Sequence, residues 1–240
     1  FEKRWAERPS RLAKLDGFRY FTLMRRVEAP EETGVAYAAD EPNYVSFTIW
    51  DDKDGFDAWR KGDAFKEAHG GGTIFGFMSM LVSSLRILKG GPKPAFYDGL
   101  LPLSSAPTEK SLKWQAEDGW RKIPADGKNP IDADVFVAMN RFKVLPGKEA
   151  AFEKQWAERE SELQQMPGFT TFLMLRRDAV SPDDGYNYST YTAWEDRASF
   201  DNWRKTKKHN TARDGEPIFE GRPSPVFYEG VLALLDQAGA

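Results

Sequence analysis

The feature that most constrains the fold of this chain is an internal repeat. Three blocks of sequence occur twice in the same order: residues 1–26 with 152–177, residues 43–61 with 187–205, and residues 94–99 with 225–230. The first pair has 14 identities in 26 gapless positions, and the second has 10 in 19. Agreement of this extent in a fixed order indicates the duplication of one ancestral domain.

The second copy is the fuller one, and its hydrophobic pattern predicts the order of its elements. We expect a strand over 134–144, a helix over 148–165, strands over 169–177 and 186–194, a helix capped by Asp196 that runs through Trp203, and a strand over 225–235. Pro146-Gly147 and Pro167-Gly168 supply the turns around the first helix. The order β-α-β-β-α-β is the ferredoxin-like motif.

Each such unit leaves one apolar face of its antiparallel sheet to be covered. We therefore expect an α+β fold in which two ferredoxin-like repeats pack sheet to sheet as a pseudo-dimeric barrel within one chain. The expected division is a first repeat over 1–103, a linker over 104–132 and a second repeat over 133–240. Trp114 and Trp120 of the linker are expected to lie over the seam as anchoring aromatic residues.

The first copy has no counterpart of the strand over 134–144. With the 151-residue offset, the partner of Asn140 would fall before Phe1. A central strand cannot be absent without leaving unpaired backbone groups on its neighbours. We therefore expect the protein to begin further upstream.

Composition narrows the chemistry. The chain has no cysteine, which excludes disulfides, iron–sulfur clusters and thiolate ligands, and its two histidines disfavour a multi-histidine metal site. The net charge is −3 with scattered basic residues, so no nucleic-acid footprint is present. No apolar run reaches the roughly 18–20 residues of a membrane span. Any chemistry is expected to come from a bound cofactor or from a substrate that reacts with oxygen.

One of the two histidines, His69, ends a helix-like stretch, FDAWRKGDAFKEAH, that begins at Phe56. We expect Asp63 to cap a short helix that ends at His69, with Gly70 as its stop. An imidazole at a helix end can bind a metal with one nitrogen and a backbone carbonyl with the other. The glycines after it allow main chain to approach a flat ligand. The apolar wall that follows contains Ile74, Phe75, Phe77, Met78, Met80, Leu81 and Val82. The pattern suits a haem site.

A simpler interpretation exists for each candidate residue. His69 taken alone also fits a surface histidine at a helix end. Trp59 and Trp203 recur at the same place in both repeats, as core tryptophans packed against a sheet do. Asn140 interrupts an apolar strand, and an amide on the concave side of the sheet needs a partner. A neighbouring loop can supply one.

In combination these residues resemble a known family. An asparagine on the first strand, a tryptophan in the second helix and a histidine ten residues later resemble the IsdG-type haem-degrading monooxygenases of the antibiotic-biosynthesis-monooxygenase superfamily. The stretch from Phe56 to His69 is similar to the family signature, and the resemblance covers both repeats but not the linker. It implies a dimeric α+β barrel.

The resemblance also implies roles. His69 would be the axial ligand of haem iron, Trp59 would press on the porphyrin and ruffle it, and an asparagine upstream of Phe1 would bond iron-bound oxygen. The implied haem pocket further includes Phe65, Gly70, Gly71, Ile74, Phe75, Phe77, Met78 and Leu81.

The second repeat departs from the pattern. Asn140 and Trp203 match, but Arg213 occupies the histidine position, and His209 lies four residues too early to replace it. The segment leading to the last strand is also 13 residues shorter, 14 from Arg213 to Phe227 against 27 from His69 to Phe96. We interpret this second site as degenerate.

The leading interpretation is a haem-degrading monooxygenase that opens the porphyrin with O2 and an external electron donor, a reductase or a ferredoxin, and releases iron. Two others stay open: a non-catalytic haem-binding carrier, and a cofactor-free monooxygenase of an aromatic or quinone substrate. We expect a monomer, because the two repeats already form a pseudo-dimer. The tandem form with one degenerate half suggests a chloroplast enzyme, with the cytoplasm as the alternative.

Overall fold

The structure is a computed structural model. It describes residues 1–6, 11–68, 88–89, 92–104, 120–121, 135–159, 162–179, 184–206 and 216–235. The second repeat follows the predicted order, with β5 (Phe136–Phe142), α6 (Glu149–Ala157), the 3-10 turn η3 (Leu163–Gln165), β6 (Phe169–Arg177), β7 (Tyr188–Trp194), α7 (Arg197–Thr206) and β8 (Ser224–Leu235). The Asp196 carboxylate accepts a hydrogen bond from the Ser199 N–H at 2.7 Å, which confirms the predicted cap.

The first repeat contains the same elements except the first strand. Its elements are α1 (Glu2–Ala6), η1 (Leu12–Lys14), β1 (Phe18–Arg26), η2 (Glu31–Thr33), β2 (Tyr44–Trp50), α2 (Lys53–Lys61), α3 (Asp63–Ala68) and β3 (Tyr97–Ser104). A two-residue strand, β4 (Trp120–Arg121), pairs with β8. Trp120 thus lies beside the last strand of the second repeat, whereas Trp114 lies outside the described residues.

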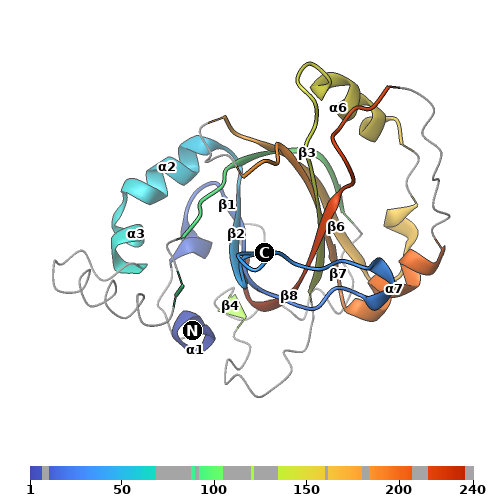
Figure 1. The fold of residues 1–240 in the computed structure, drawn as a ribbon. Helices are drawn as coiled ribbons and strands as arrows, with labels where there is room; N and C mark the ends of the chain where they lie inside the picture. Colours follow the sequence, from blue (N-terminus) through green and yellow to red (C-terminus); the bar gives the residue numbers. More distant parts are fainter. Residues whose placement is uncertain are drawn as a thin grey trace.

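All the strands form one curled antiparallel sheet, in the order β2-β1-β8-β5-β7-β6-β3. The stretch β8-β5-β7-β6 is the ferredoxin-like order of the second repeat. The last strand of each repeat pairs with a strand of the other repeat: β8 pairs with β1, and β3 pairs with β6. Figure 1 shows the sheet curling around a centre, with α2 and α3 outside one half and α6 and α7 outside the other. This is the predicted pseudo-dimer.

The sheet has an inner and an outer face, each with its own core. The inner core takes its buried residues from the strands or their ends, among them Met24, Val137, Leu175, Tyr191 and Val226. The outer face packs under the helices in two further clusters, one in each repeat. Among the described residues no strand lies between β2 and β3, so the curled sheet is open at that point.

The two repeats hold the first helix against the sheet with the same polar network. In each, a helix glutamate accepts hydrogen bonds from a tyrosine hydroxyl and an arginine guanidinium. The residues are Glu2, Tyr44 and Arg25 in the first repeat, and Glu153, Tyr188 and Arg176 in the second. The tyrosine-to-glutamate distances are 2.8 and 2.7 Å, and the arginine-to-glutamate distances are 3.1 and 3.2 Å. The duplication therefore extends to side-chain geometry.

The predicted helix over 148–165 is wrong in length. α6 ends at Ala157, with Glu158 as its C-cap, and η3 follows as a separate turn. Leu163 is buried against the second repeat's outer cluster. The chain bends after α6 and presents Leu163 from a second short element, where one straight helix had been expected to carry it.

Candidate functional site

Trp59 lies near the end of α2, which starts where the Asp52 carboxylate accepts a hydrogen bond from the Gly55 N–H at 2.8 Å. This cap fixes the helix start and so sets the direction in which the tryptophan projects. The ring of Trp59 packs against Trp50 of β2 and Phe56 of α2, with centroids 5.7 and 5.6 Å away. The indole is half-buried.

The same aromatic cluster occurs in the second repeat. The matched pairs are Trp50–Trp59 with Trp194–Trp203 (5.7 and 5.3 Å), Trp50–Phe56 with Trp194–Phe200 (6.1 Å in both), and Phe56–Phe96 with Phe200–Phe227 (5.5 and 5.6 Å). Trp59 and Trp203 therefore share one structural role as cluster members. The role of packing against the sheet holds for both tryptophans, whatever else Trp59 does.

Burial separates the two clusters. Trp194 and Phe200 are 0% and 3% exposed, whereas Trp50 and Phe56 are half-buried. The difference comes from β5, whose Phe136 lies 5.1 Å from the ring of Phe200. No described residue of the first repeat takes that place. The first cluster consequently keeps exposed aromatic surface.

Phe65 of α3 extends the first cluster toward the predicted pocket. Its ring meets that of Trp59 edge to face, with centroids 5.0 Å apart and planes at 81°. α3 ends at Ala68, so the chain passes from this aromatic pair into residue 69 within one turn of helix. The predicted cap role of Asp63 is wrong, because Asp63 lies inside α3 and its carboxylate pairs with Lys66 at 3.0 Å. The Lys66 ammonium lowers the pKa of that carboxyl.

Most of the predicted pocket lies outside the described residues. The predicted residues that lie outside the described residues are His69, Gly70, Gly71, Ile74, Phe75, Phe77, Met78, Met80, Leu81, Val82 and Arg213. The structure therefore places Trp59 and Phe65 together and leaves the ligand role of His69 as a prediction.

Asn140 is half-buried on β5, and its face of the sheet differs from the prediction. Phe136, Ala138 and Phe142, which alternate with the inward-facing residues, belong to the cluster under the helices. Asn140 shares their face, so it lies on the outer, helix-covered side and not on the concave side. Trp203 covers the same face near Trp194, which pairs with Phe136. Asn140 is four residues further along the strand, about 13 Å away.

Trp50, Phe56 and Phe96 complete the cluster around Trp59, although none of them was among the predicted site residues. The signal was available, because all three have identical counterparts in the second repeat. Aromatic identity between the repeats marks positions where both copies need the same ring.

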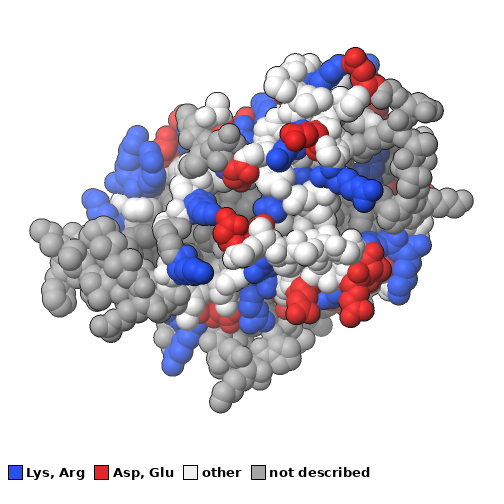
Figure 2. All heavy atoms as spheres, viewed as in Figure 1, with Lys and Arg blue, Asp and Glu red and all other residues white. Residues whose placement is uncertain are grey.

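Other site classes find no support in the part of the chain that the structure describes. It contains no group of three or more acidic or histidine side chains placed to hold a metal ion. No helix there is long and apolar enough to cross a membrane. On the face shown in Figure 2, acidic and basic side chains are interspersed, without the single-sign stripe that nucleic-acid binding requires.

Comparisons with known proteins agree with the fold. The model of the family described as antibiotic biosynthesis monooxygenase matches residues 1–71 and 135–215, parts of both repeats. A Fusobacterium nucleatum protein assigned as a monooxygenase has a similar structure, with a TM-score of 0.55 and 10% sequence identity over 92% of this chain and 79% of its own. An anthrone oxidase-like protein gives a TM-score of 0.49 and 14% identity, with coverage of 93% and 81%. No curated protein matches the sequence.

Proposed function

Since the chain belongs to the antibiotic biosynthesis monooxygenase family, we propose that it is a haem-degrading monooxygenase whose first repeat binds haem. The family supports oxygen chemistry in general. The finer assignment to haem rests on the first repeat's own residues. Only in that repeat does a histidine, His69, stand ten residues after the cluster tryptophan.

The observation that carries the proposal is the aromatic pair of Trp59 and Phe65. Both side chains are half-buried, and they meet at the point where the chain runs into His69. A porphyrin offers a wide apolar face, which aromatic side chains cover well. The described residues thus fit a flat ring beside a ligating imidazole.

Haem and the residues of the first repeat have separate roles in this proposal. Haem, once bound, supplies the iron at which O2 reacts with electrons from an external donor, a reductase or a ferredoxin. His69 would hold the haem iron through one imidazole nitrogen. Trp59, fixed by its neighbours Trp50 and Phe56, limits where the porphyrin can lie. The apolar residues after the glycines, a feature of the sequence, would help to keep water from the ring.

A second candidate is a cofactor-free monooxygenase that acts on an aromatic or quinone substrate. It is favoured by the near-identical clusters around Trp59 and Trp203, because Arg213 and not histidine occupies the ligand position after Trp203. The tryptophan position alone is therefore no sign of iron. In that reading the exposed aromatic surface of the first cluster binds the organic substrate directly.

The histidine pair provides a matched test. Haemin titrated into the protein should produce a shifted Soret band, and His69→Ala should remove the shift or weaken binding at least about tenfold, as loss of an axial ligand requires. His209→Ala, the other histidine of the chain, should bind as the parent does. Equal binding by the parent and His69→Ala would refute the ligand assignment.

Turnover then separates the candidates. With ascorbate or a reductase in air, the haem-loaded protein should lose its Soret band and yield an open-chain tetrapyrrole and free iron. Binding without loss of the band would point to a haem carrier. Oxygen uptake by haem-free protein with a polycyclic phenol or hydroquinone, unchanged in His69→Ala, would favour the cofactor-free candidate.

A further inference from the structure

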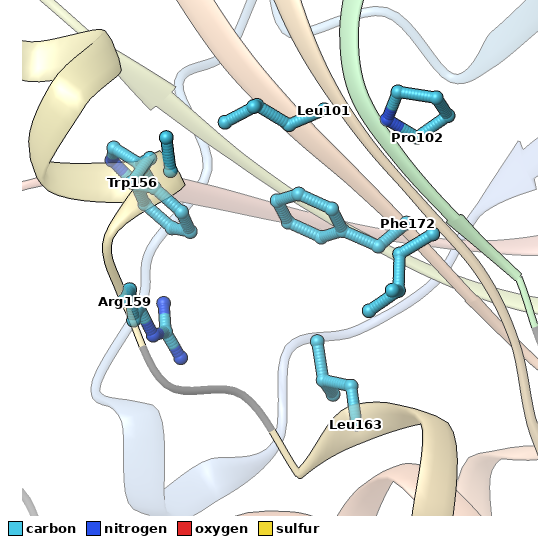
Figure 3. Close-up of a pocket in the computed structure, with 8 residues that line it drawn as sticks. Leu101, Pro102, Trp156, Arg159, Leu163 and Phe172 are labelled. Atoms are coloured by element: carbon cyan, nitrogen blue, oxygen red, sulfur yellow. The ribbon is translucent and has the colours of Figure 1, made fainter.

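A pocket of about 230 Å³ lies in the second repeat, between the end of α6, η3, β6 and the strand β3 donated by the first repeat. In Figure 3 the ring of Phe172 lies between Leu101 and Leu163, with Trp156 to the left. Phe172 and Leu163 are buried at its base, and the rings of Trp156 and Phe172 are stacked at 5.8 Å. The walls are mostly apolar. The volume is too small for a tetrapyrrole, which separates this pocket from the proposed haem site.

Arg159 brings one positive charge to this apolar pocket. Its guanidinium lies over the ring of Trp156, 4.9 Å from the centroid. Burial lowers the pKa of Arg159, and no charged neighbour contributes to that shift. Among the described residues no carboxylate pairs with it. A guanidinium stays charged at neutral pH even when its pKa is lowered by burial. The N–H groups of Arg159 can therefore donate hydrogen bonds to a ligand in the pocket.

The pocket exists because of a local break in β3. The ladder to β6 skips Leu101 and Pro102, which lie between the pairs Leu100↔Met174 and Leu103↔Phe172. Leu101 has a φ of 50° and is the one non-glycine residue with positive φ in the described part of the chain. Its side chain is 36% exposed at the rim instead of covering the base. Strained backbone of this kind concentrates at ligand sites.

The equivalent space in the first repeat is filled. By the repeat offset, Leu232 of β8 corresponds to Leu101. It pairs with Leu23 and is 1% exposed. It packs in one cluster with Ala6, Leu12 and Phe21, the counterparts of Ala157, Leu163 and Phe172. The pocket is thus a feature of one seam only.

We propose that this pocket binds a small apolar carboxylate, with its aromatic or short acyl part between Trp156, Leu163 and Phe172 and its carboxylate on Arg159. Such a ligand matches both the apolar side chains and the positive charge of the pocket. The apolar side chains can pack against the hydrocarbon part of such a ligand, and a guanidinium and a carboxylate can form two parallel charge-assisted hydrogen bonds. The site does not depend on the haem assignment.

Calorimetric titration with 4-phenylbutanoate and with its uncharged analogue 4-phenylbutanamide tests the proposal. The carboxylate should bind the parent protein about tenfold more tightly than the amide, the difference expected for a charged hydrogen-bond pair. Arg159→Gln should remove this preference and leave amide binding unchanged. Ala157→Phe, placed at an exposed position of the rim, should block both ligands by filling the opening.

Arg8→Gln is the matched control, because Arg8 matches Arg159 by the repeat offset, whereas Leu232, which matches Leu101, is only 1% exposed. It should bind both compounds as the parent does. The proposal is wrong if Arg159→Gln keeps the carboxylate preference, or if Ala157→Phe binds normally while its circular dichroism spectrum matches the parent's. Haemin binding should be the same in all these variants, so failure here leaves the proposed function untouched.

Discussion

The aromatic clusters of the two repeats have the same internal geometry and different surroundings. The centroid distances within the two sets of rings agree within a few tenths of an ångström, yet Phe200 is 3% exposed and Phe56 is half-buried. The neighbour that makes the difference is Phe136 of β5. Ring geometry is thus set inside each repeat, whereas burial is set by the strand beside it.

The two seams between the repeats differ in a similar way. β8 and β3 are equivalent strands that cross to the other repeat, and both ladders contain a bulge at the same place. In β8 pairing resumes at Leu232. In β3 it resumes only at Leu103, and the intervening Pro102 has no N–H to offer to a ladder. The seam with the pocket has a proline at this position, whereas the closed seam has Ala233 there.

The largest expected effect tests the two clusters. Phe200→Ala should lower the free energy of unfolding by about 3–5 kcal/mol, because it leaves a cavity among fully buried rings. Phe56→Ala should cost roughly half as much, since water already reaches its ring. Urea unfolding of both variants measures the difference. Equal losses would show that the exposed surface of the first cluster is covered in solution.

The next effect tests the two seams. Leu232→Ala should cost about 2–4 kcal/mol, as truncation of a buried leucine does. Leu101→Ala should cost less than about 1 kcal/mol, because that side chain is exposed at the rim of the pocket. The comparison uses the same urea midpoints. A large loss at Leu101 would mean that its side chain packs against residues beyond the described part of the chain.

The smallest effect concerns the duplicated glutamate networks. Burial, with the hydrogen bond to Glu2 as the second cause, raises the pKa of Tyr44 to about 12, and the same causes raise the pKa of Tyr188. A raised folded-state pKa gives stability that is complete below the ordinary value near 10 and is lost as pH rises toward 12. Tyr44→Phe should cost about 1 kcal/mol at pH 8. The gap to the parent protein should narrow at pH 11.

Tyr188→Phe is the companion variant. Tyr188 is 2% exposed, so the loss of stability caused by Tyr188→Phe should persist to higher pH than the loss caused by Tyr44→Phe. Urea unfolding at pH 8 and pH 11 distinguishes the two. A pH-independent gap in both variants would contradict the pKa shifts.

The repeat made most of the fold predictable. Blocks that recur in fixed order locate the strands and α7 to within a few residues, and the Asp196 cap follows from local chemistry. The helix over 148–165 was overestimated because nothing local, neither glycine nor proline, marks its end at Ala157. The face of Asn140 was also misassigned, since alternation along a strand shows which residues share a face but not which face the helices cover.

The pocket around Arg159 was not predictable from local sequence. Its walls come from β3 and from α6, η3 and β6, segments some 55–70 positions apart in the chain. What creates it is an alteration in a strand of the opposite repeat. The difference between Leu101-Pro102 and Leu232-Ala233 is visible in the sequence. It indicates a pocket only once β3 and β8 are known to pair with strands of the other repeat.

The exchange of β3 and β8 also bears on how such a protein can evolve. In a homodimer a single gene encodes both crossing strands, so a proline at one junction is imposed on its mate. Joined in tandem, the junctions mutate separately, and one can remain a sealed hydrophobic contact while the other loosens into a cavity. In a fused chain, a mutation at one junction therefore leaves the other unchanged. The β3 junction can then acquire a pocket while the β8 junction stays tightly packed.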